Sequence, residues 1–90
     1  MENCITVSLP TALVRLFPGA ANAMEQKAST VREVIDQLNA GWPGMRDRLI
    51  DSRRAIRRHI NIYVAGKKAS LKTPLQPGAR ATILTAMSGG

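Results

Sequence analysis

The sequence predicts an α+β fold in which one main helix packs across one face of a mixed sheet of four to five strands. Residues 5–9 and 60–64 alternate apolar and polar side chains, which is typical of half-buried strands. Residues 31–38 carry apolar side chains at helical spacing. No second helical stripe of that length occurs in the 90 residues, so a single helix on one face of the sheet is the economical arrangement.

The first third of the chain is expected to form a hairpin. Apolar and polar side chains alternate in residues 4–9, with Ile5 among those that face inward, and Pro10 ends this strand. Residues 11–16 are expected to be a short apolar connector, and residues 23–28 to return as the second strand.

A capping box marks the start of the helix. Thr30 supplies the N-cap hydroxyl, and Glu33 stands three residues later. The helix is predicted over residues 31–40, with Gly41 as the left-handed residue after it and Pro43 preventing continuation.

The remaining elements complete the expected sheet. They are a helical piece at 45–50, a basic surface loop at 51–58, strands at 60–64, 69–71 and 81–86, and a hairpin-like turn at 65–68. The first and last strands are expected at central positions, because a right-handed crossover through the helix leads to the middle of the sheet. This order of elements is that of a ubiquitin-like β-grasp domain.

Composition excludes several classes of protein. Cys4 is the single cysteine, which leaves no disulfide framework and no cysteine-based zinc site. Cys4 itself is expected to be partly buried rather than a thiol carrier. No leader sequence and no run long enough to span a membrane is apparent, so a cytoplasmic protein is expected. The sequence offers no catalytic triad, phosphate loop or metal site, and no catalytic or metal-binding residue is assigned.

The positive charge is concentrated in one cluster. The net charge is +7, and Arg53, Arg54, Arg57 and Arg58 stand within six residues. Such a cluster favours electrostatic docking of a partner. A nucleic-acid-binding module that uses residues 53–58 is an alternative, although no aromatic residue is interleaved for base stacking.

The chain ends on two glycines. Residues 1–86 are expected to form the domain and residues 87–90 a flexible tail. Because Gly89 and Gly90 lack a Cβ, the terminal carboxylate could be threaded down a narrow channel into the active site of an activating enzyme.

The chain resembles the small sulfur-carrier proteins of the ThiS/MoaD type. The resemblance covers nearly the whole chain and is closest in residues 5–11, 60–64 and 81–90, with 61–64 and the spacing from Ile83 to the Gly-Gly end most similar to the cysteine-biosynthesis branch. One departure is the turn at 77–79, where family members often carry acidic residues on both sides of the glycine.

The resemblance implies a carrier without catalytic groups or bound cofactor. A partner adenylyltransferase of the ThiF/MoeB type would use ATP to adenylate Gly90, and a sulfurtransferase or sulfide would convert it to a thiocarboxylate. An acceptor synthase, such as a cysteine synthase, would take the sulfur. A thioacid or siderophore pathway is the next choice of acceptor, and molybdopterin or thiamin synthesis follows.

The remaining roles concern the tail and the docking surface. Gly89, Ser88 and Met87 would give the tail its reach. If Ala81 and Ile83 face the helix, the other face of the last strand would dock the partner, and the residues assigned to that surface are Leu84, Ala86 and Tyr63. A ubiquitin-like modifier conjugated through Gly90, and a β-grasp interaction domain without tail chemistry, remain open alternatives.

Overall fold

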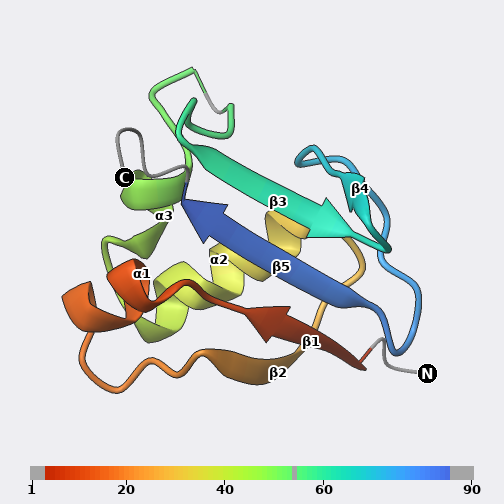
Figure 1. Cartoon of the computed structure of the whole chain (residues 1–90), viewed down its shortest axis with the longest axis horizontal. Helices are drawn as coiled ribbons and strands as arrows, with labels where there is room; N and C mark the ends of the chain where they lie inside the picture. Colours follow the sequence, from red (N-terminus) through yellow and green to blue (C-terminus); the bar gives the residue numbers. More distant parts are fainter. Residues whose placement is uncertain (1–3, 54, 86–90) are drawn as a thin grey trace.

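The computed structural model describes residues 4–53 and 55–85, which form one sheet with helices on one face (Figure 1). The strands are β1 Cys4–Ser8, β2 Ala23–Lys27, β3 Ile60–Val64, β4 Lys67–Lys68 and β5 Arg80–Thr85. The helices are α1 Thr11–Leu16, α2 Val31–Gly41 and α3 Met45–Leu49. The predicted fold class, a mixed sheet with one main helix packed across it, is confirmed.

The sheet has the strand order β2-β1-β5-β3-β4, so the first and last strands are central as expected. β1 and β5 run parallel, with Val7 opposite Ala81. All other neighbours are antiparallel. A parallel pair needs a long crossover connection, and here that connection includes α2.

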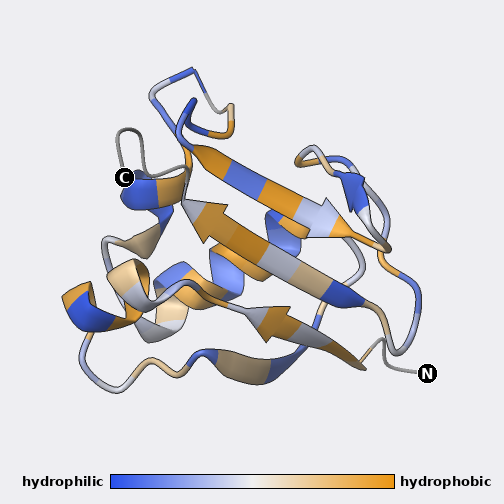
Figure 2. Ribbon diagram, viewed as in Figure 1, coloured by the Kyte–Doolittle hydropathy of each residue, from blue (hydrophilic) through white to orange (hydrophobic). Residues whose placement is uncertain are grey.

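The core lies between the sheet and α2. Alternate residues of β1, β3 and β5 are buried, and Figure 2 shows apolar residues along β5, at the centre of the sheet. They meet one face of the helix; the buried side chains are Ile5, Val7, Ile60, Ile62, Ala81 and Ile83 from the strands, and Val31, Val34, Ile35 and Leu38 from α2. The period of two in the strands therefore leaves the opposite face of the sheet open to solvent.

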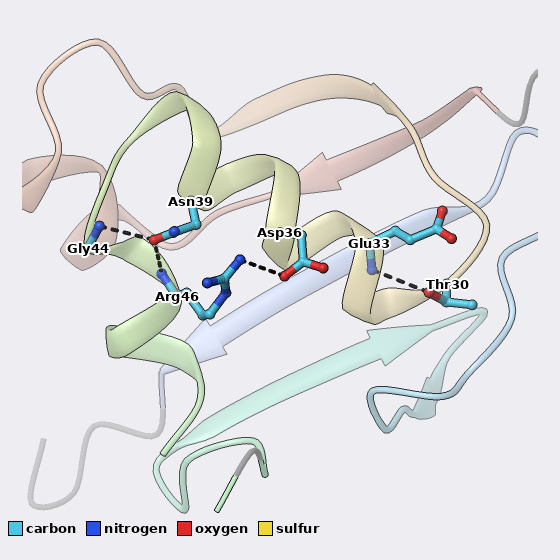
Figure 3. Close-up of polar contacts among 6 residues, drawn as sticks. All are labelled: Thr30, Glu33, Asp36, Asn39, Gly44 and Arg46. Atoms are coloured by element: carbon cyan, nitrogen blue, oxygen red, sulfur yellow. Dashed lines mark hydrogen bonds and ion pairs between the residues drawn. The ribbon is translucent and has the colours of Figure 1, made fainter. Parts of the chain in front are cut away.

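The capping box at the start of α2 forms in a displaced version. The hydroxyl of Thr30 accepts a hydrogen bond from the backbone N–H of Glu33 at 3.3 Å (Figure 3). The Glu33 carboxylate accepts one from the N–H of Ser29 at 2.7 Å, one residue before the N-cap. The first bond satisfies a first-turn N–H group that has no partner within the helix, and the second fixes the residue that precedes the N-cap.

The end of α2 differs from the prediction. Gly41 is the last helical residue rather than a left-handed one, and the N–H of Trp42 still donates to the carbonyl of Leu38. The left-handed residue is Gly44, with φ of 99°. The helix is one residue longer than predicted because Pro43, not Gly41, stops it. The chain then changes direction at Gly44.

A side chain of α2 caps α3. The Asn39 side-chain oxygen accepts hydrogen bonds from the N–H groups of Gly44 at 3.0 Å and Arg46 at 3.1 Å, and the Arg46 guanidinium pairs with Asp36 at 2.8 Å (Figure 3). The expected short helix near residue 45 is therefore confirmed and is tied to the main helix.

Two expectations about short elements are wrong. Residues 11–16 form α1 rather than a connector, because the carbonyl of Pro10 accepts from two N–H groups and Leu13 becomes buried. The fourth strand is Lys67–Lys68 rather than 69–71. Ala65 and Gly66 both have positive φ, at 54° and 80°, and make a two-residue turn, so the chain returns earlier than expected.

Candidate functional site

The predicted carrier tail begins directly after a central strand. Met87, Ser88, Gly89 and Gly90, together with the assigned docking residue Ala86, lie outside the described residues. The described chain ends with β5 at Thr85, which is opposite Ile60 of β3. The described chain therefore ends within the paired centre of the sheet.

The face of β5 that turns away from α2 carries an exposed apolar side chain. Ala81 and Ile83 are buried beneath the sheet, and Leu84 is 44% exposed on the other side, as predicted. Leu84 lies opposite Asn61, and its neighbour on the same face, Thr82, lies opposite Tyr63. Leu84 and Tyr63 are thus diagonal neighbours on adjacent strands.

Leu84 and Tyr63 line a common surface groove, which is called here the β5 groove. Its volume is about 470 Å³, and its other lining residues are Ala65, Gly66, Ala79, Arg80 and Thr82. The structure therefore brings together two of the three docking residues assigned from the sequence. Their docking role remains a prediction.

Arg80 and Thr82 belong to this face but were not singled out from the sequence. The Arg80 guanidinium donates a hydrogen bond to the Ser8 hydroxyl at 2.8 Å, across the boundary between β5 and β1. The signal was available, because positions 80, 82 and 84 alternate along one strand and share a face. Arg80 adds a positive charge to the rim of the β5 groove.

The arginine cluster sits on a surface loop, as expected, and hydrogen bonds within the loop organise it. The Asp51 carboxylate accepts hydrogen bonds from the N–H groups of Ala55 at 3.1 Å and Arg53 at 2.9 Å. The N–H of Asp51 in turn donates to the carbonyl of Ala55 at 2.9 Å, and Ile50 and Ile56 form an isolated β-bridge. Arg54 lies outside the described residues.

These contacts lower the pKa of Asp51 below the ordinary aspartate value. The N–H of Ala55 is the main cause, and the N–H and charge of Arg53 add to it against an opposing effect of burial. The N–H groups of the loop therefore favour the ionised form of Asp51.

The loop lies beside the point where the tail begins. Two hydrogen bonds hold Arg57. Its backbone N–H donates to the carbonyl of Leu49 at 2.8 Å, and its side-chain Nε donates to the carbonyl of Asp47 at 2.7 Å. The N–H of Ile60 donates to the carbonyl of Arg57, and Ile60 pairs with Thr85. Figure 1 shows this loop at the end of β5. The structure thus brings Arg57 close to Thr85, two residues distant in sequence.

Several other features bear on chemistry. Across residues 4–53 and 55–85, no three His, Cys, Asp or Glu side chains gather where they could hold a metal ion. Within the same residues no helix is long and apolar enough to cross a membrane.

Cys4 is exposed, so the expectation that it is partly buried is wrong. The alternation that turns Ile5 inward turns Cys4 outward.

Comparisons of the sequence and of the structure with known proteins find relatives that agree with one another. A model of the ThiS family matches residues 7–90. The chain is 35% identical over 92 residues to the sulfur carrier protein CysO of Mycobacterium tuberculosis, which spans 96% of this chain and 98% of that protein. In the crystal structure of the Amycolatopsis orientalis BexX/CysO complex, one chain matches with a TM-score of 0.83 and 33% identity, over 96% of this chain and 99% of that one.

A more distant likeness concerns the fold alone. The crystal structure of SAMP1 from Haloferax volcanii matches with a TM-score of 0.80 at 20% identity, over 97% of this chain and 99% of that chain.

Proposed function

The chain belongs to the ThiS family, and on that premise we propose that it is a sulfur-carrier protein of cysteine biosynthesis, with sulfur carried as a thiocarboxylate on Gly90. The observation that carries the proposal is the extent of the family match, which includes both the sheet and the Gly-Gly end. The identity to CysO over nearly the whole of both chains supports the same role. The protein is a carrier rather than a catalyst.

The proposed chemistry takes place on the terminal carboxylate. A carboxylate is a poor electrophile, so the Gly90 oxygen first attacks the α-phosphorus of ATP and pyrophosphate leaves. A sulfur nucleophile then attacks the carbonyl carbon of the acyl adenylate, and AMP leaves with the bonding electron pair. With sulfide as the donor, loss of its proton leaves a thiocarboxylate on Gly90. With a persulfide donor, an acyl disulfide forms first; a second thiol then attacks the donor sulfur and is oxidised to a disulfide with the donor, and the thiocarboxylate leaves with the electron pair of the S–S bond. The thiocarboxylate is a strong nucleophile for the acceptor substrate.

Three partners are proposed for these steps. They are an adenylyltransferase of the ThiF/MoeB type that uses ATP, a sulfurtransferase or sulfide as donor, and a cysteine synthase as acceptor. The β5 groove includes Leu84, the neighbour of Thr85, and the arginine loop is hydrogen-bonded to Ile60, which lies opposite Thr85. A partner that receives the tail would meet both surfaces, so the fold would select the partner and the glycines would deliver the carboxylate.

The test is an intact-mass measurement. The protein is incubated with ATP, an adenylyltransferase of this type and sulfide, and we expect one terminal oxygen to be replaced by sulfur. Omission of ATP is the first control, and a variant that lacks Gly89-Gly90 is the second. Adding a cysteine synthase with its activated serine substrate should then form a covalent carrier–cysteine adduct, as the thiocarboxylate sulfur bonds to the Cβ of the substrate and the activating group leaves. Hydrolysis of the acyl bond to Gly90 would return the oxygen form and release cysteine.

Other results would assign other functions. An unchanged mass, with full function after deletion of Gly89-Gly90, would remove the carrier role. An isopeptide bond between Gly90 and a lysine would favour a modifier. Sulfur transfer to a different acceptor would move the protein to a thioacid, siderophore, molybdopterin or thiamin pathway while leaving the carrier role intact.

A further inference from the structure

A second groove lies at the opposite edge of the sheet from β2. It runs along the outer side of β3, has a volume of about 550 Å³ and is called here the β3 groove. One wall is formed by residues 55–58 and the other by residues 68–72. The floor is apolar, with buried Ile60, Ile62 and Ala69 and half-buried Ile56 and Leu71.

The rim of the β3 groove carries charge of one sign. Arg57, Arg58, Lys68 and Lys72 line it, and no carboxylate is among its described lining residues. Three acidic side chains, Asp36, Asp47 and Asp51, line an adjoining depression that shares Leu71 and Lys72 with the β3 groove. The Asp36 carboxylate pairs there with the Arg46 guanidinium. The Asp51 carboxylate lies 3.6 Å from the Arg53 guanidinium and accepts a hydrogen bond from the N–H of Ala55 in its own loop. Four cations above an apolar floor are complementary to an occupant with both carboxylates and apolar side chains.

Both walls are held in place by the fold. The first wall is tied by the Ile50–Ile56 bridge and by the hydrogen bond from Arg57 to Leu49. In the second wall, the Leu71 carbonyl accepts from the N–H of Arg32 at 3.0 Å, and the N–H of Ser70 donates to the Thr73 hydroxyl at 2.8 Å. A groove with fixed walls loses little conformational entropy when an occupant binds.

The edge of β3 that borders this groove is only partly covered. β4 pairs with Tyr63 and Val64, and one further hydrogen bond joins the N–H of Ala69 to the carbonyl of Ile62. At Ile60, no described strand lies on this side of β3, but the Ile60 N–H already donates to the carbonyl of Arg57, so only part of this edge can pair with a peptide. An uncovered strand edge is a surface along which an extended peptide can lie.

We propose that the β3 groove binds an extended acidic segment of a partner protein. An apolar side chain of the segment rests on Ile56 and Leu71, and carboxylates before and after it face Arg58 and Lys72. The length of β3 corresponds to a segment of about five residues. This surface is distinct from the β5 groove and does not depend on the chemistry of Gly90.

The probe is a short capped peptide with a Val-Leu-Val centre and aspartates on both sides, titrated into the nitrogen-labelled full chain without any partner enzyme. We expect amide shifts to cluster at residues 55–62 and 68–72. The affinity should fall as salt is raised, because exposed charge pairs are screened. A peptide with a serine centre, and one with lysines in place of the aspartates, should each bind at least about tenfold more weakly.

A matched pair of variants tests the location. Arg58→Glu and Arg15→Glu make the same change in net charge, and both arginines are exposed. Arg58 lines the groove, whereas Arg15 lies on α1 outside it. Arg58→Glu should lower the affinity for the acidic peptide about tenfold, and Arg15→Glu should leave that affinity within about twofold of the value for the unchanged protein. Lys72→Glu, on the other wall, should behave as Arg58→Glu does.

Several outcomes would overturn the proposal. They are equal losses in Arg15→Glu and Arg58→Glu, shifts centred on Leu84, no saturable binding, or tighter binding of a single-stranded oligonucleotide at the same residues. Because no activating enzyme is present, any of these would leave the sulfur-carrier role untouched, and loss of that role would leave peptide binding unchanged.

Discussion

Thr85 lies directly opposite Ile60 in the antiparallel pairing of β5 with β3. Ile60 is also hydrogen-bonded to Arg57, so the last described residue of the central strand and the arginine loop share one corner of the sheet. Thr85 therefore lies next to Leu84 of the apolar β5 groove and close to the loop that carries Arg57.

Substitution of Leu84 tests the β5 groove. Leu84→Asp places a charge on an exposed apolar surface, so the KM of an adenylyltransferase for this carrier should rise about tenfold while the melting temperature changes little. Leu16→Asp is the matched control, because Leu16 is 51% exposed on α1 and lies outside the β5 groove. An equal rise in KM for both variants would show that the effect is not local to this surface.

Substitution of Thr30 tests the cap of α2. Thr30→Ala removes the hydroxyl that accepts from Glu33 and should lower the free energy of unfolding by about 1 kcal/mol. For a domain of this size, the melting temperature should fall by roughly 4–8 °C. Thr30→Ser retains the acceptor and should recover most of the loss. A Ser variant as unstable as the Ala variant would attribute the effect to lost packing instead.

The turn between β3 and β4 offers a pair of opposite effects. Gly66 has φ of 80°, and a Cβ added to it would meet no atom within 4 Å, so Gly66→Ala should destabilise by about 1 kcal/mol through backbone strain alone. Ala65 has φ of 54°, and Ala65→Gly should stabilise by about 0.5 kcal/mol, since relief of strain exceeds the added freedom of the unfolded chain. Denaturant titration measures both, and two changes of the same sign would contradict this turn geometry.

The stability contribution of Asp51 should depend on pH. Its folded pKa is below the ordinary value of 3.8, so ionised Asp51 stabilises the fold fully above that pH and loses its effect as the pH falls through the folded value. Asp51→Asn retains an oxygen acceptor but not the charge. The difference in melting temperature between the two proteins should be constant near neutral pH and shrink below pH 3.8. A difference that persists at the lowest pH of folding would contradict this account.

Much of the fold follows from local patterns in the chain. The alternation in residues 5–9 and 60–64, and the helical stripe that begins at Val31, predict the main strands and the helix because burial of one face imposes those periods. The same alternation correctly places Leu84 on the outer face. Short elements were harder to predict. Nothing local distinguishes helix α1 from a connector, and its stability depends on burying Leu13 in a core made by other segments.

By itself, the sequence determined the β-grasp order, the inward faces of the strands, and a Gly-Gly end whose backbone can pass through a narrow channel. These properties depend on residue type and spacing along the chain. Tertiary structure alone decided that Arg80 reaches Ser8, that the arginine loop lies beside Thr85, and that four cations surround an apolar groove along β3. Each joins segments far apart in sequence, and such contacts arise only when strand pairing sets which neighbours meet.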